Sequence, residues 1–163
     1  MKISRKPTRI VIEQLDDFLV ELMRRIPSSA KPGGNQAAKE RIFSKPESVE
    51  GKLSDDWKLY VEPELQYLFQ TALEVVDGDL KKVKRKKQEN GEFISSLSFS
   101  PEHIEAWLSA TNQARLVLSE VYNFREAELS GEIPEAINNE KDLALFQVHF
   151  YGFIQECFLR ILE

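Results

Sequence analysis

Residues 99–124 form the stretch that most constrains how this chain can fold. Ser100 and Pro101 suit the start of a helix, because serine can cap free backbone donors and proline fits the first helical turn. The residues that follow are mostly apolar and recur at steps of three and four, which predicts one helix face made of Ile104, Leu108, Thr111, Leu118 and Tyr122. Arg115 falls on the same face, so a permanent positive charge interrupts this seam.

Arg115 is a charged residue on an otherwise apolar helix face, so its position needs an explanation. Burying an unpaired guanidinium is costly, so we expect Arg115 to meet a carboxylate, a set of carbonyls or an anionic ligand, or to extend its head to solvent. Glu156 is the preferred partner, and Asn112 is placed to join the same polar cluster. A structural ion pair or a surface arginine explains Arg115 more simply than a ligand site does.

Three further helices are predicted from the same periodicity. The first covers residues 13–26 and is ended by Pro27, and the second covers residues 54–87 with a kink or junction near Pro63. The last, residues 140–162, is apolar on every side, so it should be the central helix of a bundle or part of a homodimer interface.

Two short strands are expected at residues 8–13 and 93–99, where β-branched or alternating apolar residues occur. They should pair in parallel or antiparallel and lie against the helices. The predicted fold is therefore mainly α: a bundle of about four to five helices with a small two-stranded β ribbon. Residues 1–163 should form a single domain, with a basic arm at 1–7 and a loop-rich connection at 28–53.

Composition indicates a soluble globular protein. Of the 163 residues, 42% are hydrophobic and 30% charged, and the formal net charge is -5. Cys157 is the single cysteine, which excludes an intramolecular disulfide and fits a reducing compartment. No apolar run is long enough for a signal-peptide core or a membrane span, so we expect a cytoplasmic protein.

Basic residues are concentrated in two segments. The first holds Lys2, Arg5, Lys6 and Arg9, and the second holds Lys81, Lys82, Lys84, Arg85, Lys86 and Lys87. Without these ten residues the chain has 12 basic against 27 acidic residues, so its charge is strongly polarised. Parallel strand pairing would join the segments into one positive pole for nucleic acid or an acidic protein, and antiparallel pairing would separate them. Solvated surface is the more ordinary explanation, since no aromatic residue interrupts the second segment.

Catalytic motifs are not evident. No glycine-rich phosphate loop occurs, and His103 and His149 lack a second ligand at metal spacing. His149 and Cys157 are the one candidate pair for nucleophilic catalysis, but they point about 80 degrees apart on one helix. We therefore expect no enzyme activity, no metal and no cofactor.

Several motifs resemble a known bacterial family. Residues 105–108 (Glu-Ala-Trp-Leu), followed by Asn112, Arg115, Leu116 and Leu118, look like the signature of the largely actinobacterial domain of unknown function numbered 2017. Phe150 and residues 153–156 (Phe-Ile-Gln-Glu), and more weakly residues 41–43 (Arg-Ile-Phe), are also similar. Gln113 and Ser119 depart from the family pattern, which often has Asp and Gly there.

The resemblance implies a compact, mainly helical bacterial cytoplasmic protein with no enzymatic activity or cofactor to carry over. We expect a non-enzymatic interaction or regulatory protein that recognises a protein partner, with a polar-aromatic cluster at Trp107, Asn112, Arg115, Gln155 and Glu156. Two alternatives remain. One is a nucleic-acid-binding regulator that uses residues 2–9 and 81–87, and the other is a site for a small anion at Arg115.

Overall fold

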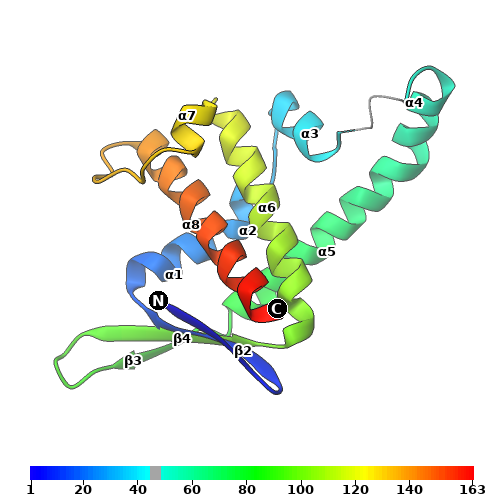
Figure 1. The fold of residues 1–163 in the computed structure, drawn as a ribbon. Helices are drawn as coiled ribbons and strands as arrows, with labels where there is room; N and C mark the ends of the chain where they lie inside the picture. Colours follow the sequence, from blue (N-terminus) through cyan, green and yellow to red (C-terminus); the bar gives the residue numbers. More distant parts are fainter. Residues whose placement is uncertain (45–48) are drawn as a thin grey trace.

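The computed structural model describes residues 1–44 and 49–163, in which helices cover one side of a four-stranded antiparallel sheet (Figure 1). The strands are β1 (Lys2–Lys6), β2 (Arg9–Leu15), β3 (Lys84–Lys87) and β4 (Phe93–Phe99), in the order β1-β2-β4-β3. This mixed α/β fold contradicts the prediction of a mainly α bundle with a two-stranded ribbon. The two predicted strands do pair, as β2 and β4, but each also gains an outer neighbour.

The outer strands were missed because they lack an apolar face. β3 is Lys-Arg-Lys-Lys and is exposed throughout, and β1 comes from the segment predicted to be a basic arm. Each of them pairs with an apolar neighbouring strand, and this pairing holds it in the sheet although its side chains are mostly charged. Lysine at sheet edges also discourages pairing with another chain, because adding a strand would bring charges together.

The alternation of β2 and β4 places their apolar residues against the helices. Ile10, Ile12 and Leu15 of β2 and Leu97 and Phe99 of β4 are buried. The register shifts between Ile12 and Leu15, and Gln14 has a positive φ of 59°. This bulge places Leu15, rather than the preceding residue, in the core.

The N-terminal helices are α1 (Asp17–Arg24), α2 (Ile26–Ser29) and α3 (Gln36–Ile42). Asp16 caps α1, since its Oδ1 accepts a hydrogen bond from Leu19 N at 2.8 Å. Pro27 was predicted to end a helix, but it lies in the first turn of the next helix, α2. The part of the predicted loop at 45–48 lies outside the described residues.

The middle of the chain forms α4 (Lys52–Asp56), the π-helical turn η1 (Trp57–Val61) and α5 (Glu62–Leu80). The π turn lies directly before Pro63, where a kink was predicted. The prediction that the helix continues to residue 87 was wrong, because the chain leaves α5 after Leu80 and enters strand β3.

The C-terminal half contains η2 (Pro101–His103), α6 (Ile104–Val121), α7 (Glu126–Leu129) and α8 (Glu140–Leu162). The start of the helical stretch differs from the prediction, because Pro101 opens a 3₁₀ turn and the Ser100 side chain makes no capping bond. Asn139 caps α8 through a 2.9 Å bond from Asp142 N.

Helix α6, not α8, is the central helix. It contacts α2, α3, α5 and α8, and Trp107 at its core is fully buried. Phe99, Trp107 and Phe158 form an aromatic cluster between β4, α6 and α8, with ring centroids 5.1 to 6.0 Å apart. The apolar side chains around α8 are only partly buried, since Phe153, Leu159 and Leu162 are exposed. A homodimer contact through residues 140–162 stays a prediction.

Among the described residues, none of the helices has the length and apolarity needed to cross a membrane.

Candidate functional site

Arg115 joins the two longest C-terminal helices through an amide rather than a carboxylate. Its Nη1 donates to Gln155 Oε1 at 2.7 Å, and Gln155 Nε2 donates to Leu108 O at 3.2 Å. Gly152 lets the guanidinium lie against α8, because a Cβ there would be only 3.3 Å from Arg115 Cζ. The pair therefore acts as a polar bridge between α6 and α8.

Arg115 is incompletely satisfied. Its Nε atom is buried and has no acceptor among the described residues, and desolvation lowers the pKa of the guanidinium. A half-buried cation with a free donor is a weak stabiliser of the fold. Small-anion binding at Arg115 stays a prediction, although Nη1 is already engaged by Gln155.

The predicted five-residue cluster is not one site. Glu156 is exposed and pairs with Arg160, four residues along the same helix, instead of with Arg115. Asn112 is exposed on α6. Trp107 donates its indole N–H to a residue that sequence reasoning did not select, Asp79.

Asp79 is the centre of a buried polar cluster with three side-chain partners. Its side chain is 0% exposed and lies in the last turn of α5. Oδ2 accepts from Trp107 Nε1 at 3.1 Å and lies 2.8 Å from His103 Nδ1, while Oδ1 accepts from Lys82 Nζ at 2.9 Å. The carboxylate thus connects the end of α5 to the beginning of α6.

The sequence does contain a signal for this cluster. His103 and Trp107 are four residues apart, so their ring donors lie on one side of the chain and can share one acceptor. Because His103 and Lys82 reach solvent while the carboxylate and indole are buried, the arrangement is typical of a structural tie between helices.

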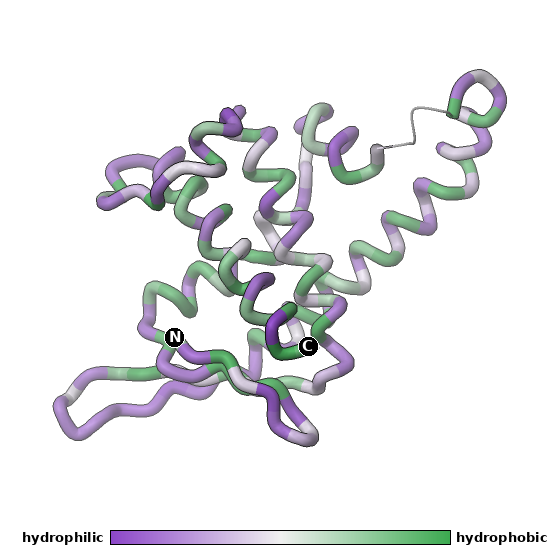
Figure 2. The backbone as a smooth tube through the Cα atoms, in the orientation of Figure 1, coloured by the Kyte–Doolittle hydropathy of each residue, from purple (hydrophilic) through white to green (hydrophobic). Residues whose placement is uncertain are grey.

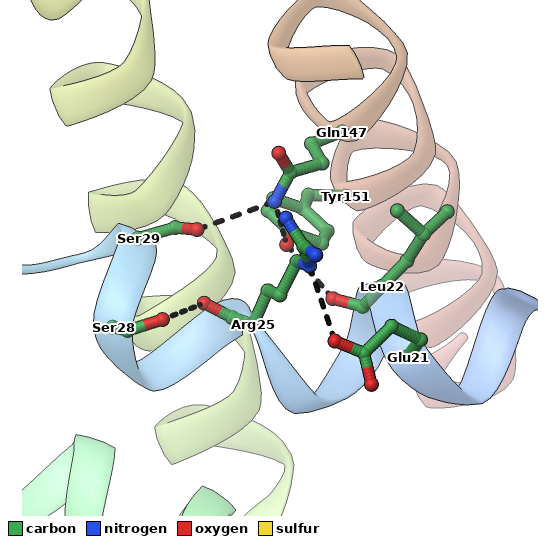
Figure 3. A network of polar contacts seen from close by, with 7 residues as sticks. All are labelled: Glu21, Leu22, Arg25, Ser28, Ser29, Gln147 and Tyr151. Carbon is green, nitrogen blue, oxygen red and sulfur yellow. Dashed lines mark hydrogen bonds and ion pairs between the residues drawn. The ribbon is translucent and has the colours of Figure 1, made fainter. Parts of the chain in front are cut away.

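A second polar network ties α8 to the N-terminal helices (Figure 3). The buried Tyr151 hydroxyl donates to Leu22 O at 2.8 Å and accepts from Gln147 Nε2 at 2.8 Å. Gln147 Nε2 is also 3.2 Å from Ser29 Oγ. Burial raises the pKa of Tyr151 to about 12, which keeps the phenol neutral and able to donate.

The predicted basic contact residues have different surroundings. Lys81, Lys82 and Arg85 are each engaged by an aspartate, at positions 77, 79 and 17 respectively, and Arg85 also lies 3.8 Å over the Phe93 ring. Arg5 is directed to the C-terminal end of α8, where its Nη1 is 3.5 Å from Ile161 O. The remaining predicted residues, Lys6, Lys84, Lys86 and Lys87, are exposed on the outer strands.

The two basic segments lie at opposite edges of the sheet. β2 and β4 pair antiparallel, β1 adds beside β2, and β3 adds beside β4. A single compact positive pole of the kind that parallel pairing would produce is therefore absent from the described strands.

A helical arm extends away from the body of the molecule (Figure 1). We call α4, η1 and residues 62–70 of α5 the arm. A groove of about 730 Å³ separates the arm from α3, and it is lined by residues that include Glu40, Phe43, Trp57 and Pro63. Phe43, which lines the groove, also stacks on Phe69 with ring centroids 5.6 Å apart. Trp57 Nε1 is buried without an acceptor in the described part of the chain.

The described residues do not bring the sequence-derived candidates for metal binding or nucleophilic catalysis together. They contain no group of three or more His, Cys, Asp or Glu side chains that could hold a metal ion. Burial raises the pKa of the Cys157 thiol, which opposes nucleophile formation, and His149 Nε2 lies 3.3 Å from Glu128 O rather than beside that thiol.

Comparison with curated proteins and with solved structures found no match. One family model matches residues 5–162, which is almost the full chain, and it is described as "Domain of unknown function (DUF2017)". The resemblance seen in the motifs of α6 and α8 is thereby confirmed, and the chain belongs to the DUF2017 family.

Proposed function

We propose that this chain is a non-enzymatic interaction protein that recognises a partner protein through the arm. The observation that carries the proposal is the exposure of five large apolar side chains on this projecting segment. Leu53, Leu59, Tyr60, Tyr67 and Leu68 are each between 58% and 69% exposed. Clustered exposed apolar side chains are a feature of protein interaction sites, whereas single ones are ordinary.

The contrast along α5 supports this role. Leu73, Val76 and Leu80 in its second half are buried against the body, while Tyr67 and Leu68 in its first half are exposed. An isolated helix is marginal in water, so a projecting helix gains stability when another surface covers it. The tube in Figure 2 shows apolar residues recurring along this exposed half.

The charges of the arm indicate the chemistry of the partner. Residues 52–64 carry four acidic side chains, Asp55, Asp56, Glu62 and Glu64, against two basic ones, Lys52 and Lys58. A complementary partner offers an apolar groove with a basic rim, as in the recognition of an amphipathic helix by a groove. The π turn at Trp57–Val61 is also consistent with binding, since such turns are frequent at functional sites.

Site-specific photo-crosslinking tests the proposal. The full chain is produced in its native cell with benzoylphenylalanine in place of Tyr67, or in place of Glu89 at the tip of the β3–β4 hairpin as a control. We expect one heteromeric product from position 67 and none from position 89. The product should disappear in a Leu59→Glu, Tyr60→Glu variant, which places charges in the apolar contact.

A matched variant separates loss of the apolar surface from added charge. Gln66→Glu, Gln70→Glu introduces the same two negative charges at exposed polar positions of α5 and should leave the product intact. Circular dichroism should show all variants folded, because the changed side chains are exposed. A product from position 89 as well, no product from position 67, or a product containing two copies of this chain would overturn the proposal.

A further inference from the structure

The sheet has one face that the helices leave uncovered. In Figure 1 the helices lie on one side of the sheet, and its other side faces away from them. Side chains alternate between the two faces of a strand, so the burial of Ile10, Ile12, Leu97 and Phe99 identifies the inner face. The strand register then assigns the other set of residues, which we call the open face: Lys2, Ser4, Lys6, Arg9, Val11, Glu13, Lys84, Lys86, Ile94, Ser96 and Ser98.

The open face is strongly positive in an acidic protein. It carries five basic side chains, Lys2, Lys6, Arg9, Lys84 and Lys86, and one acidic side chain, Glu13, which is opposite Lys2 in the register. None of the five basic side chains has an ion-pair partner among residues 1–44 and 49–163. In contrast, the nearby Lys81, Lys82 and Arg85 are neutralised within the fold. The five positive charges of the open face are therefore not neutralised within the fold.

The geometry spreads these charges over a broad, low surface. β1 and β3 are separated by three strand spacings, which is about 14 Å. Lys86 and Lys6 are also offset along the strands by about six residues, or about 20 Å, so the basic residues run diagonally over about 25 Å. Between the two edges, the central strands present the short side chains of Val11, Ser96 and Ser98 beside Arg9, Glu13 and Ile94. The short side chains let a polyanion approach, and the serines supply hydroxyl donors for phosphate oxygens.

The shape and chemistry of the open face favour duplex DNA over a single strand. Proteins that bind single strands stack bases on aromatic side chains, and the open face has none, because Phe93 and Phe99 belong to the inner face. A separation of about 14 Å between basic edges is comparable to the major groove of B-form DNA, which is about 12 Å wide, so each edge can meet one phosphate backbone.

We propose that the open face binds double-stranded DNA through its phosphates, without reading the sequence. Lys2, Lys6 and Arg9 contact one backbone, and Lys84 and Lys86 contact the other. This proposal is independent of the arm and of its protein partner.

Fluorescence anisotropy of the full chain with a labelled mixed-sequence duplex, across a salt series, tests the proposal. Five phosphate contacts predict a slope of about -4.5 in log K against log salt, so affinity should fall about 500-fold between 50 and 200 mM salt. The Lys84→Gln, Lys86→Gln variant loses two contacts, so its fall over the same range should be about 40-fold.

Two controls make the outcome decisive. The Lys31→Gln, Lys39→Gln variant changes the net charge equally at exposed positions outside the sheet and the arm, and should keep the slope of the unmodified protein. A single strand of the same sequence should bind more weakly than the duplex. The proposal is overturned by no binding at 50 mM salt, by equal loss in both variants, by tighter binding of the single strand, or by binding of polyglutamate but not of duplex.

Discussion

Replacing Asp79 by alanine should lower the free energy of unfolding by about 2 to 4 kcal/mol, because one buried carboxylate serves three donors. The largest contribution comes from Trp107, whose indole N–H is fully buried and would lose its acceptor at a cost of about 1 to 3 kcal/mol. The contact with His103 adds about 1 kcal/mol.

Lys82 should contribute little to this loss. Its side chain is 59% exposed, so water replaces the carboxylate, and such pairs contribute about 0 to 1 kcal/mol. The side chain of His103 is 31% exposed and can also turn to solvent. The substitution leaves no buried charge unpaired, so the expected loss of about 2 to 4 kcal/mol is centred below the value for a broken buried ion pair, about 3 to 5 kcal/mol.

Urea unfolding followed by circular dichroism measures the effect, with an unchanged m-value showing that the same surface is exposed on unfolding. Asp77→Ala is the matched control, since Asp77 is two residues away, exposed, and paired only with the exposed Lys81. It should remain within about 0.5 kcal/mol of the unmodified protein. Equal losses for the two variants would refute the role assigned to the Asp79 cluster.

Three further outcomes follow from the buried groups. In urea unfolding, Gln155→Leu should lower the free energy of unfolding by about 2 kcal/mol, because it leaves the half-buried guanidinium of Arg115 unpaired. Arg115→Met should lower it by only about 1 kcal/mol, because it removes the guanidinium itself. The reverse order would contradict the role of Arg115 and Gln155 as a polar bridge between α6 and α8. The contribution of Tyr151 to the free energy of unfolding should be constant below pH 10 and fall between about pH 10 and pH 12 by about 1.4 kcal/mol per pH unit, because the folded protein holds the Tyr151 proton more tightly than the unfolded chain does. Tyr151→Phe should remove that part of the slope, and an unchanged slope would contradict the assignment. Iodoacetamide should label Cys157 more slowly in the folded protein than in urea, because burial raises the pKa of this thiol; equal rates would show that the thiol is accessible and unperturbed.

Apolar periodicity predicted the elements that form the core. The seam after Pro101 corresponds to α6, and the alternation at 93–99 corresponds to β4. These patterns are informative because each element must bury one face, and burial selects residues at the period of a helix or strand. β1 and β3 carry no such pattern, since their stability comes from backbone pairing with an apolar neighbour.

Partners across helices could not be predicted in the same way. Gln155 and Glu156 are adjacent, yet their side chains point about 100 degrees apart around α8, and only Gln155 faces Arg115. Charge alone favoured Glu156. Which of two neighbouring residues meets another helix depends on the rotation of both helices, which the spacing along one helix does not contain. Asp79 was missed for the same reason, because its partners are 24 and 28 residues away.

Amide hydrogen exchange along α5 in the purified protein, without a partner, measures whether the arm is a free surface. We expect rapid exchange at residues 62–70 of the arm and strong protection at residues 72–80, where the same helix lies against the body. Uniform protection from residue 62 to residue 80 would show that the arm is already covered, and would contradict its assignment as a free surface for a partner.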